Sequence, residues 1–194
     1  VVDGESAQVQ QQPVTLGSGV AQVSCSIGFC AAQQLDQPSG RALLDAAQVA
    51  GDEAAQYRPG AIRAYSAELA HARADRDALR DGFAGAVDRG EVRAFFQPQV
   101  STDSGEVTGV EALVRWQHPD RGWLSPAAFL PAIEGSDLMD LLGQTMLTQS
   151  LAALAEFDRK GLRVPTVAVN FSAQELRDPQ LPERLRWTLD RFQL

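Results

Sequence analysis

The chain has 194 residues, of which 44% are hydrophobic and 22% are charged, a composition that excludes disordered, collagen-like and disulfide-scaffold proteins. Its 25 acidic and 17 basic residues give a formal charge of −8, which argues against a binder of nucleic-acid polymers because such proteins present basic surfaces. A small anionic ligand stays compatible, since a bound cation or a local arginine reverses the field. The sequence contains no run of about 18 apolar residues, the length needed to span a membrane. Its polar N-terminal segment lacks the features of a signal peptide.

The N-terminal part of the chain predicts short strands. Residues 1–19 are rich in Gln and Gly and contain one short apolar stretch, which indicates an edge strand or a helix tail. The alternation of apolar residues over 20–30 predicts a half-buried strand. Cys25 and Cys30 lie on opposite faces of that strand, too far apart to form a disulfide. They are expected to be reduced structural thiols, which fits a cytoplasmic protein.

Two helices are predicted next. The first covers residues 41–57, with Ser39 as its N-cap, and is followed by a short strand in AIRAYS. The second covers residues 66–89 and has a narrow seam of heptad type. The seam consists of Leu69, Ala72, Arg76, Leu79, Phe83 and Ala86. Two interpretations stay open: a connecting helix packed on a domain, or a connector that transmits a signal or pairs with another copy.

From residue 92 the pattern alternates between strand and helix, which predicts an α/β fold with parallel strands. Strands are expected near 92–100, 109–116 and 164–170, the last one buried on both faces. Residues 118–126 read as a loop. Helices are expected over 126–134, over 137–161 and from Pro182 to Arg191, and Ser172 with Glu175 forms a capping box that opens a helix.

The strand at 109–116 carries two charged side chains on one face. Glu111, Leu113 and Arg115 point the same way, and burying a carboxylate or a guanidinium without a partner is costly. Glu111 and Arg115 cannot pair with each other, because their Cα atoms would lie about 13 Å apart along the strand. Either each has a separate ion-pair partner, or Glu111 binds a hard cation and Arg115 binds a phosphate.

Two amide side chains are further candidates. Asn170 follows the apolar residues Val167-Ala168-Val169, at the carboxyl end of a predicted parallel strand, where barrel proteins build their sites. It can offer an oxygen to a metal ion or help to cap the next helix. Gln97 precedes Pro98, which ends the strand or places it at an edge. His71 and His118 are the two histidines, and neither has a second His or Cys at metal-ligand spacing.

The segments FFQPQV, GEVTGVEALVRWQHPDRGWLSPAAFLPAIE and VAVNFS together resemble the opening of an EAL domain, with Glu111-Ala112-Leu113 as the motif that gives the family its name. Upstream, VSCSIGF, LLDAAQVAGDEAAQ and IRAYS resemble, more loosely, the end of a GGDEF domain. The implied order is a GGDEF-like portion over 1–66, a linking helix over 67–91 and the first part of an EAL domain over 92–194.

The resemblance implies a fold and an activity. EAL domains are barrels of the (β/α)8 type that hydrolyse cyclic di-GMP to pGpG with Mg²⁺ or Mn²⁺. By the resemblance, Glu111 is a catalytic metal ligand and Asn170 a second ligand, while Arg115 holds a substrate phosphate. The dinucleotide contacts are implied for Gln97, Leu113 and Pro126. The partner is cyclic di-GMP rather than a nucleic-acid polymer, in a cytoplasmic protein whose parent can be membrane-anchored.

The chain departs from the family in length. A complete barrel takes about 250 residues, and the later acidic and lysine motifs of EAL domains are absent. We therefore expect two partial domains, truncated at both ends, whose open sheet edges or linking helix favour a homodimer. The parent protein is predicted to be an active phosphodiesterase, and the chain by itself is predicted to be inactive. The alternative is an inactive EAL-like module that binds cyclic di-GMP or a protein.

Overall fold

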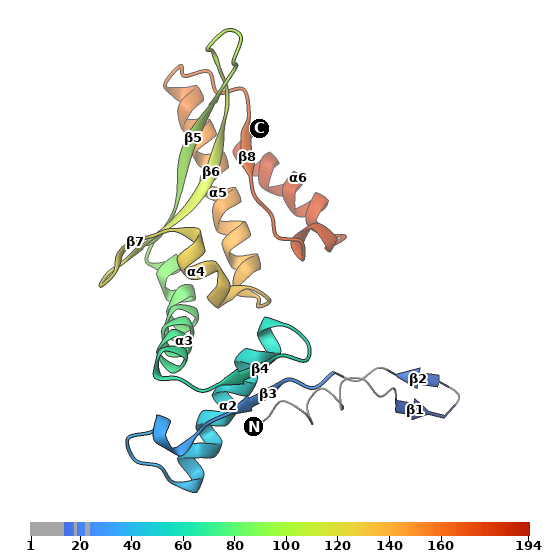
Figure 1. The fold of residues 1–194 in the computed structure, drawn as a ribbon. Coiled ribbons are helices and arrows are strands. Elements are labelled where there is room, and N and C mark those ends of the chain that lie inside the picture. Colours follow the sequence, from blue (N-terminus) through green and yellow to red (C-terminus); the bar gives the residue numbers. More distant parts are fainter. Residues whose placement is uncertain (1–13, 18, 22–23) are drawn as a thin grey trace. The chain divides into compact units, whose positions relative to one another are not determined.

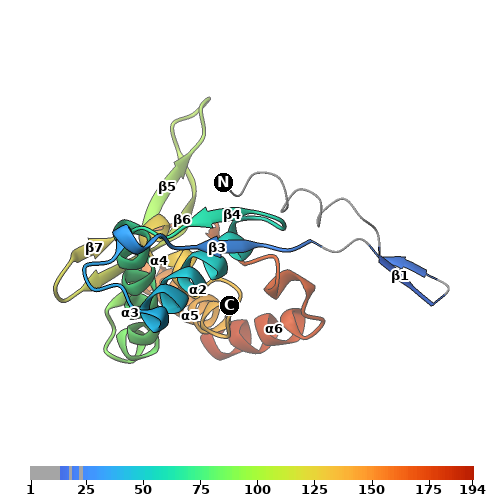
Figure 2. The same ribbon diagram turned by 60° about the horizontal axis from the view of Figure 1, so that its bottom comes forward.

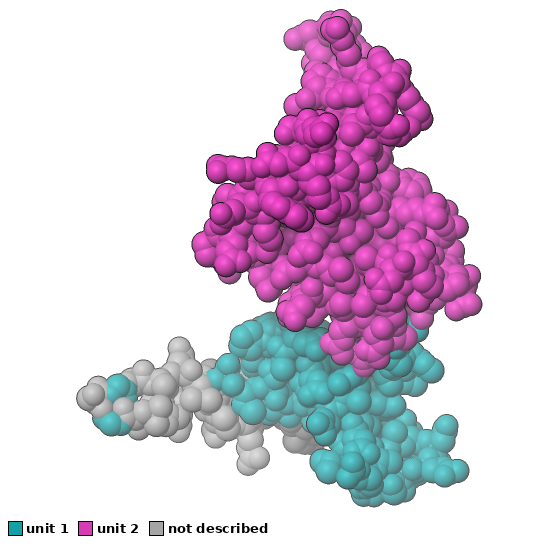
Figure 3. Space-filling view, turned by 180° about the vertical axis from the view of Figure 1, so that it is seen from behind, with its two compact units in different colours: residues 1–75 teal, residues 76–194 magenta. Residues whose placement is uncertain are grey.

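The structure is a computed structural model that describes residues 14–17, 19–21 and 24–194. The Gln-rich start and Val23 lie outside the described residues. The chain divides into two compact units, residues 1–75 and residues 76–194 (Figure 3). In the part of the chain described, no helix has both the length and the apolar character needed to cross a membrane.

The described residues of the first unit form two small sheets, one long helix and the start of a second long helix. Strands β1 (Val14–Leu16) and β2 (Gly19–Ala21) pair antiparallel, and β3 (Ile27–Phe29) pairs parallel with β4 (Ile62–Ala64). Between β3 and β4 come the short helix η1 (Ala32–Gln34) and α2 (Gly40–Tyr57). The predicted helix and its cap are confirmed, because the Ser39 hydroxyl accepts a hydrogen bond from the Ala42 amide at 3.1 Å.

The predicted strand over residues 20–30 is wrong in extent. β3 has three residues, and Cys25 and Cys30 lie outside it. Its position depends on close backbone contact with α2 rather than on an alternating apolar face. A Cβ atom on Gly28 would lie 2.0 Å from the backbone nitrogen of Gly51 and 2.2 Å from the carbonyl oxygen of Ala47. Only glycine allows this approach, and Figure 2 shows β3 running along α2.

Helix α3 (Ala67–Asp88) leads into the second unit, which is built on one mixed sheet (Figure 1). The long central strand β6 (Val107–His118) pairs antiparallel with β5 (Val92–Val100) and with β7 (Gly122–Leu124). It pairs parallel with β8 (Val167–Val169). The remaining elements are α4 (Pro126–Ile133), α5 (Leu138–Arg159), η2 (Glu175–Arg177) and α6 (Leu181–Phe192).

The two faces of this sheet differ in burial. Val92, Ala112 and Trp116 lie on one face and are buried against α3, α4 and α5. The Trp116 ring meets Phe83 and Phe129 edge to face, at centroid distances of 5.5 and 5.6 Å. Because side chains alternate along a strand, the opposite face carries the odd-numbered residues of β5 and β6. Apart from Gly109, which is buried, these residues are exposed or half-buried.

Several expectations for the second unit need correction. Residues 118–126 were expected to be a loop but include β7, which the positive φ of Gly122 allows to turn back onto β6. β8 is shorter than predicted and is covered on one face, so that Ala168 is exposed. The capping box of Ser172 and Glu175 opens a 3₁₀ turn rather than an α-helix. The sheet is mixed rather than parallel, and the seam of α3 is buried only at its second half.

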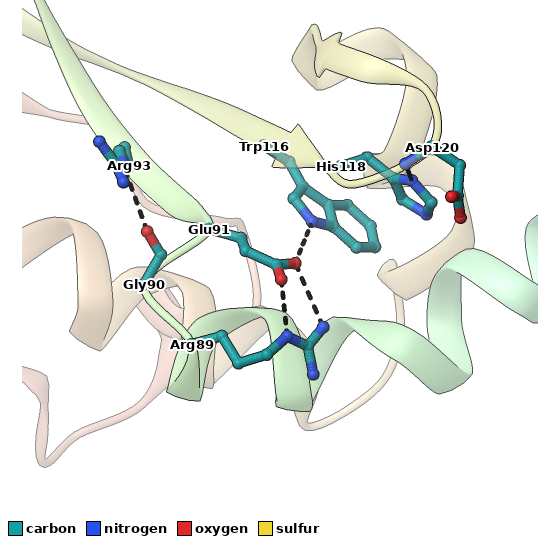
Figure 4. Close-up of polar contacts among 7 residues, drawn as sticks. All are labelled: Arg89, Gly90, Glu91, Arg93, Trp116, His118 and Asp120. Atoms are coloured by element: carbon teal, nitrogen blue, oxygen red, sulfur yellow. Dashed lines mark hydrogen bonds and ion pairs between the residues drawn. The ribbon is translucent and has the colours of Figure 1, made fainter.

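A polar network joins the end of α3 to the sheet (Figure 4). The Arg89 guanidinium donates two hydrogen bonds to the Glu91 carboxylate, the shorter at 2.6 Å, and Trp116 Nε1 donates a third at 3.4 Å. The Glu91 carbonyl accepts from the Gln117 amide. The hydrogen bonds from Arg89 lower the pKa of the Glu91 carboxyl, with a smaller contribution from Trp116.

Candidate functional site

Glu111 and Asn170 meet at the centre of the second unit's sheet. Glu111 lies in β6 opposite Ala168 of the parallel strand β8, and Asn170 follows two residues later on the same face. The Asn170 side chain donates a hydrogen bond from Nδ2 to Glu111 Oε1 at 2.9 Å. The structure therefore brings together the two side chains that sequence reasoning named as metal ligands.

Gln97 and Arg115 lie on the same face. Gln97 is directly opposite Glu111 in the β5–β6 pairing, and its side chain is exposed. Arg115 is half-buried, and its guanidinium donates to the carbonyl oxygen of Val114 at 2.7 Å. Within the described residues neither Glu111 nor Arg115 has an ion-pair partner, so separate ion pairs do not account for them. Both charges stay available to a ligand.

Leu113, Pro126 and Asn170 line a cavity of about 390 Å³. Its remaining wall comes mainly from apolar side chains of α4 and α5, including Met139 and Met146, and from the segment after β8. Pro126 occupies the first position of α4, where its ring suits the helical start. Leu113 and Asn170 thus belong both to the cavity lining and to the sheet face that carries Gln97, Glu111 and Arg115.

Two aromatic residues on this face were missed from the sequence. Phe95, opposite Leu113, and Trp123, opposite Gln117, are 45% and 49% exposed, and their rings meet edge to face at 5.0 Å. Phe95 could have been found from its two-residue spacing to Gln97. No signal marked Trp123, because its segment reads as a loop.

The site offers oxygen ligands. In the part of the chain described, no group of three His, Cys, Asp or Glu side chains is arranged to hold a metal ion. One carboxylate and one carboxamide remain, at Glu111 and Asn170. This donor set fits Mg²⁺ or Mn²⁺, because Mg²⁺ keeps several waters and binds through one or two carboxylates together with substrate phosphates.

Comparison with known families identifies the second unit. The protein-family model described as "EAL domain" matches residues 76–194, which is more than half of the chain. The chain belongs to the EAL-domain family. The match begins within α3, so the second half of that helix is part of the family's domain.

Similar proteins carry the names of cyclic di-GMP enzymes. The cyclic di-GMP phosphodiesterase RocR of Pseudomonas aeruginosa is 34% identical over 56% of this chain. The bifunctional diguanylate cyclase/cyclic di-GMP phosphodiesterase MucR of the same organism is 28% identical over 94% of this chain. A solved complex of the MucR phosphodiesterase with cyclic di-GMP aligns with a TM-score of 0.57 and 31% identity, over 60% of this chain and 47% of that one. The chain spans 13% to 27% of the lengths of the curated relatives it matches.

Proposed function

We propose that this protein is part of a cyclic di-GMP phosphodiesterase that hydrolyses its substrate to pGpG with Mg²⁺ or Mn²⁺. The observation that carries the proposal is the contact between Glu111 and Asn170 at 2.9 Å on an accessible sheet face. Membership of the EAL-domain family and the names of the relatives support it.

The proposed roles follow from the geometry. Glu111 and Asn170 would hold the cation, and Glu111 is the catalytic ligand among them. When bound, the cation supplies an activated water and offsets charge on the phosphate. Arg115 would bind a phosphate oxygen, for which its guanidinium has no competing carboxylate among the described residues. Gln97 would contact the dinucleotide across the sheet face, and Leu113 and Pro126 would contact it from the cavity wall.

The architecture of the parent protein is also a proposal. Residues 1–66 would be the end of a GGDEF-like domain, residues 67–91 a linking helix, and residues 92–194 the start of a (β/α)8 barrel. The alignment with MucR supports this order, because it covers 94% of the chain and MucR is named a diguanylate cyclase as well as a phosphodiesterase. A cytoplasmic location would give the protein access to cyclic di-GMP, which is made from GTP.

The decisive test is a calorimetric titration of the 194-residue chain with cyclic di-GMP, with and without Mn²⁺. We expect binding that requires the metal and weakens at least about tenfold in Glu111→Ala, as removal of a metal ligand should. Glu106→Ala is the matched control, because Glu106 is exposed in the β5–β6 turn and lies outside the site. Equal affinity in wild type and Glu111→Ala would refute the assignment.

The titration also separates the alternative function. Binding of cyclic di-GMP that does not depend on a divalent ion would favour an inactive EAL-like receptor module. Arg115, Gln97 and the cavity wall would then be sufficient for recognition, and Glu111 would have no role in affinity.

A further inference from the structure

The segment between Asn170 and η2 is held by reciprocal hydrogen bonds. The Glu175 carboxylate accepts from the Ser172 amide at 2.8 Å, and the Ser172 hydroxyl accepts from the Glu175 amide at 3.1 Å. Asn170 itself follows the last paired residue of β8, Val169, so the strand ladder does not fix its side chain. The turn that follows has to do so.

Glu175 is unusually buried for an acidic residue. It is 3% exposed, and the described residues place no cation within ion-pair distance of its carboxylate. Burying a carboxylate with the Ser172 amide as its backbone donor and no counter-charge among the described residues is costly. Such a position is difficult to explain by helix capping alone, because an exposed Glu satisfies a cap equally well.

The other side of Glu175 is closed by helix α5. A Cβ atom on Gly143 would lie 1.8 Å from Glu175 Oε1, so Gly143 provides the space that the carboxylate occupies. The neighbouring Leu142 and Met146 belong to the hydrophobic core. The carboxylate is therefore placed against a rigid, packed helix on one side and holds Ser172 on the other.

We propose that Glu175, seated on Gly143, is a positioning residue that sets the Asn170 amide against Glu111. The connection runs from α5 through the Glu175 carboxylate to the Ser172 amide, and from there over two residues to Asn170. The role of Asn170 as a metal ligand belongs to the proposed function, on which this inference rests.

Gly143→Ala tests the proposal selectively. The added methyl group meets the end of a flexible side chain, so the carboxylate has to leave Ser172 while the helix gains a better helix former. We expect Mn²⁺ affinity, measured by electron paramagnetic resonance, to fall about tenfold, as for loss of a residue that orients a ligand. The Asn170 side-chain amide signal in the nuclear magnetic resonance spectrum should shift toward its position in Glu111→Ala. Gly82→Ala in α3 is the control, because a Cβ there meets nothing within 4 Å.

A double-mutant cycle closes the test. If Gly143 acts through Glu175, then Gly143→Ala should cause no further loss in a Glu175→Ala background, and Glu175→Gln should retain most of the affinity. An unchanged Asn170 signal and Mn²⁺ affinity in folded Gly143→Ala would overturn the proposal, as would additive losses. Should the wild type bind no Mn²⁺, the metal site of the proposed function fails, and the Asn170 signal still decides the positioning role.

Discussion

At the scale of single residues, two candidate side chains carry charges that have no ion-pair partner among the described residues. Glu111 is bound by an amide and Arg115 by its own strand's carbonyl oxygen. Glu91 is the opposite case, since its carboxylate is bound by Arg89 and Trp116. The contrast separates a carboxylate bound to a counter-charge within the fold from one that, on the proposed function, binds a cation.

Glu91 predicts a pH-dependent contribution to stability. Its pKa is lowered in the folded state by the hydrogen bonds from Arg89, so its stabilising effect is complete above the ordinary glutamate pKa of about 4.3 and disappears as the pH falls through the lowered value. Glu91→Gln should therefore lower the urea midpoint at neutral pH, with the difference from wild type vanishing in acid. Glu106→Gln, in an exposed turn, serves as the control. A difference that persists unchanged at low pH would show that charge is not involved.

At the scale of secondary-structure elements, close backbone packing between β3 and α2 stabilises the first unit. Gly28→Ala should separate β3 from α2, because the added Cβ atom would clash with the backbone of Gly51 and Ala47, which cannot move aside. We expect a loss of about 1–3 kcal/mol, seen as faster hydrogen exchange in α2. Gly40→Ala, with nothing within 4 Å of its Cβ, should have little effect. All three tryptophans lie in the second unit, so tryptophan fluorescence should report no change there; equal exchange in both variants would contradict the expectation.

Long elements could be predicted from the sequence because their periodicity is strong. The helices at 40–57, 67–88 and 138–159 and the strands β5 and β6 were found in this way. The alternation in β6 also placed Glu111 and Arg115 on one face, as the structure has them. β7 and the short extent of β3 could not be predicted, since three-residue strands depend on tertiary pairing and on the space left by Gly28. The role of Gly143 required knowing which side chain faces it.

At the scale of the whole molecule, the edge of β5 is occupied at Val92 and Ala94. The Gln149 side chain donates to the Val92 carbonyl and accepts from the Ala94 amide, at 2.8 and 2.7 Å. Pro98 lies four residues after Ala94, so its backbone nitrogen points to the same edge, and proline has no amide hydrogen to donate. Occupied and donor-free edges discourage pairing with another chain. The predicted homodimer stays a prediction.

Gln149→Ala should release this edge. We expect greater self-association than in wild type, measured by light scattering over a range of concentrations, because two backbone groups of β5 lose their partner. Gln144→Ala, on an exposed position of the same helix, is the matched control. No increase over Gln144→Ala would mean that Gln149 does not protect the edge.

The alternation along β6 has an evolutionary consequence. Substitutions at Ala112, Val114 and Trp116 act on the core, so they change how much folded protein a cell accumulates. On the proposed function, substitutions at Glu111, Leu113 and Arg115 would leave that amount largely intact and would change what each molecule binds. Ligand binding would then be lost without loss of folded protein, whereas a one-residue insertion in β6 would exchange the two sets and disrupt both.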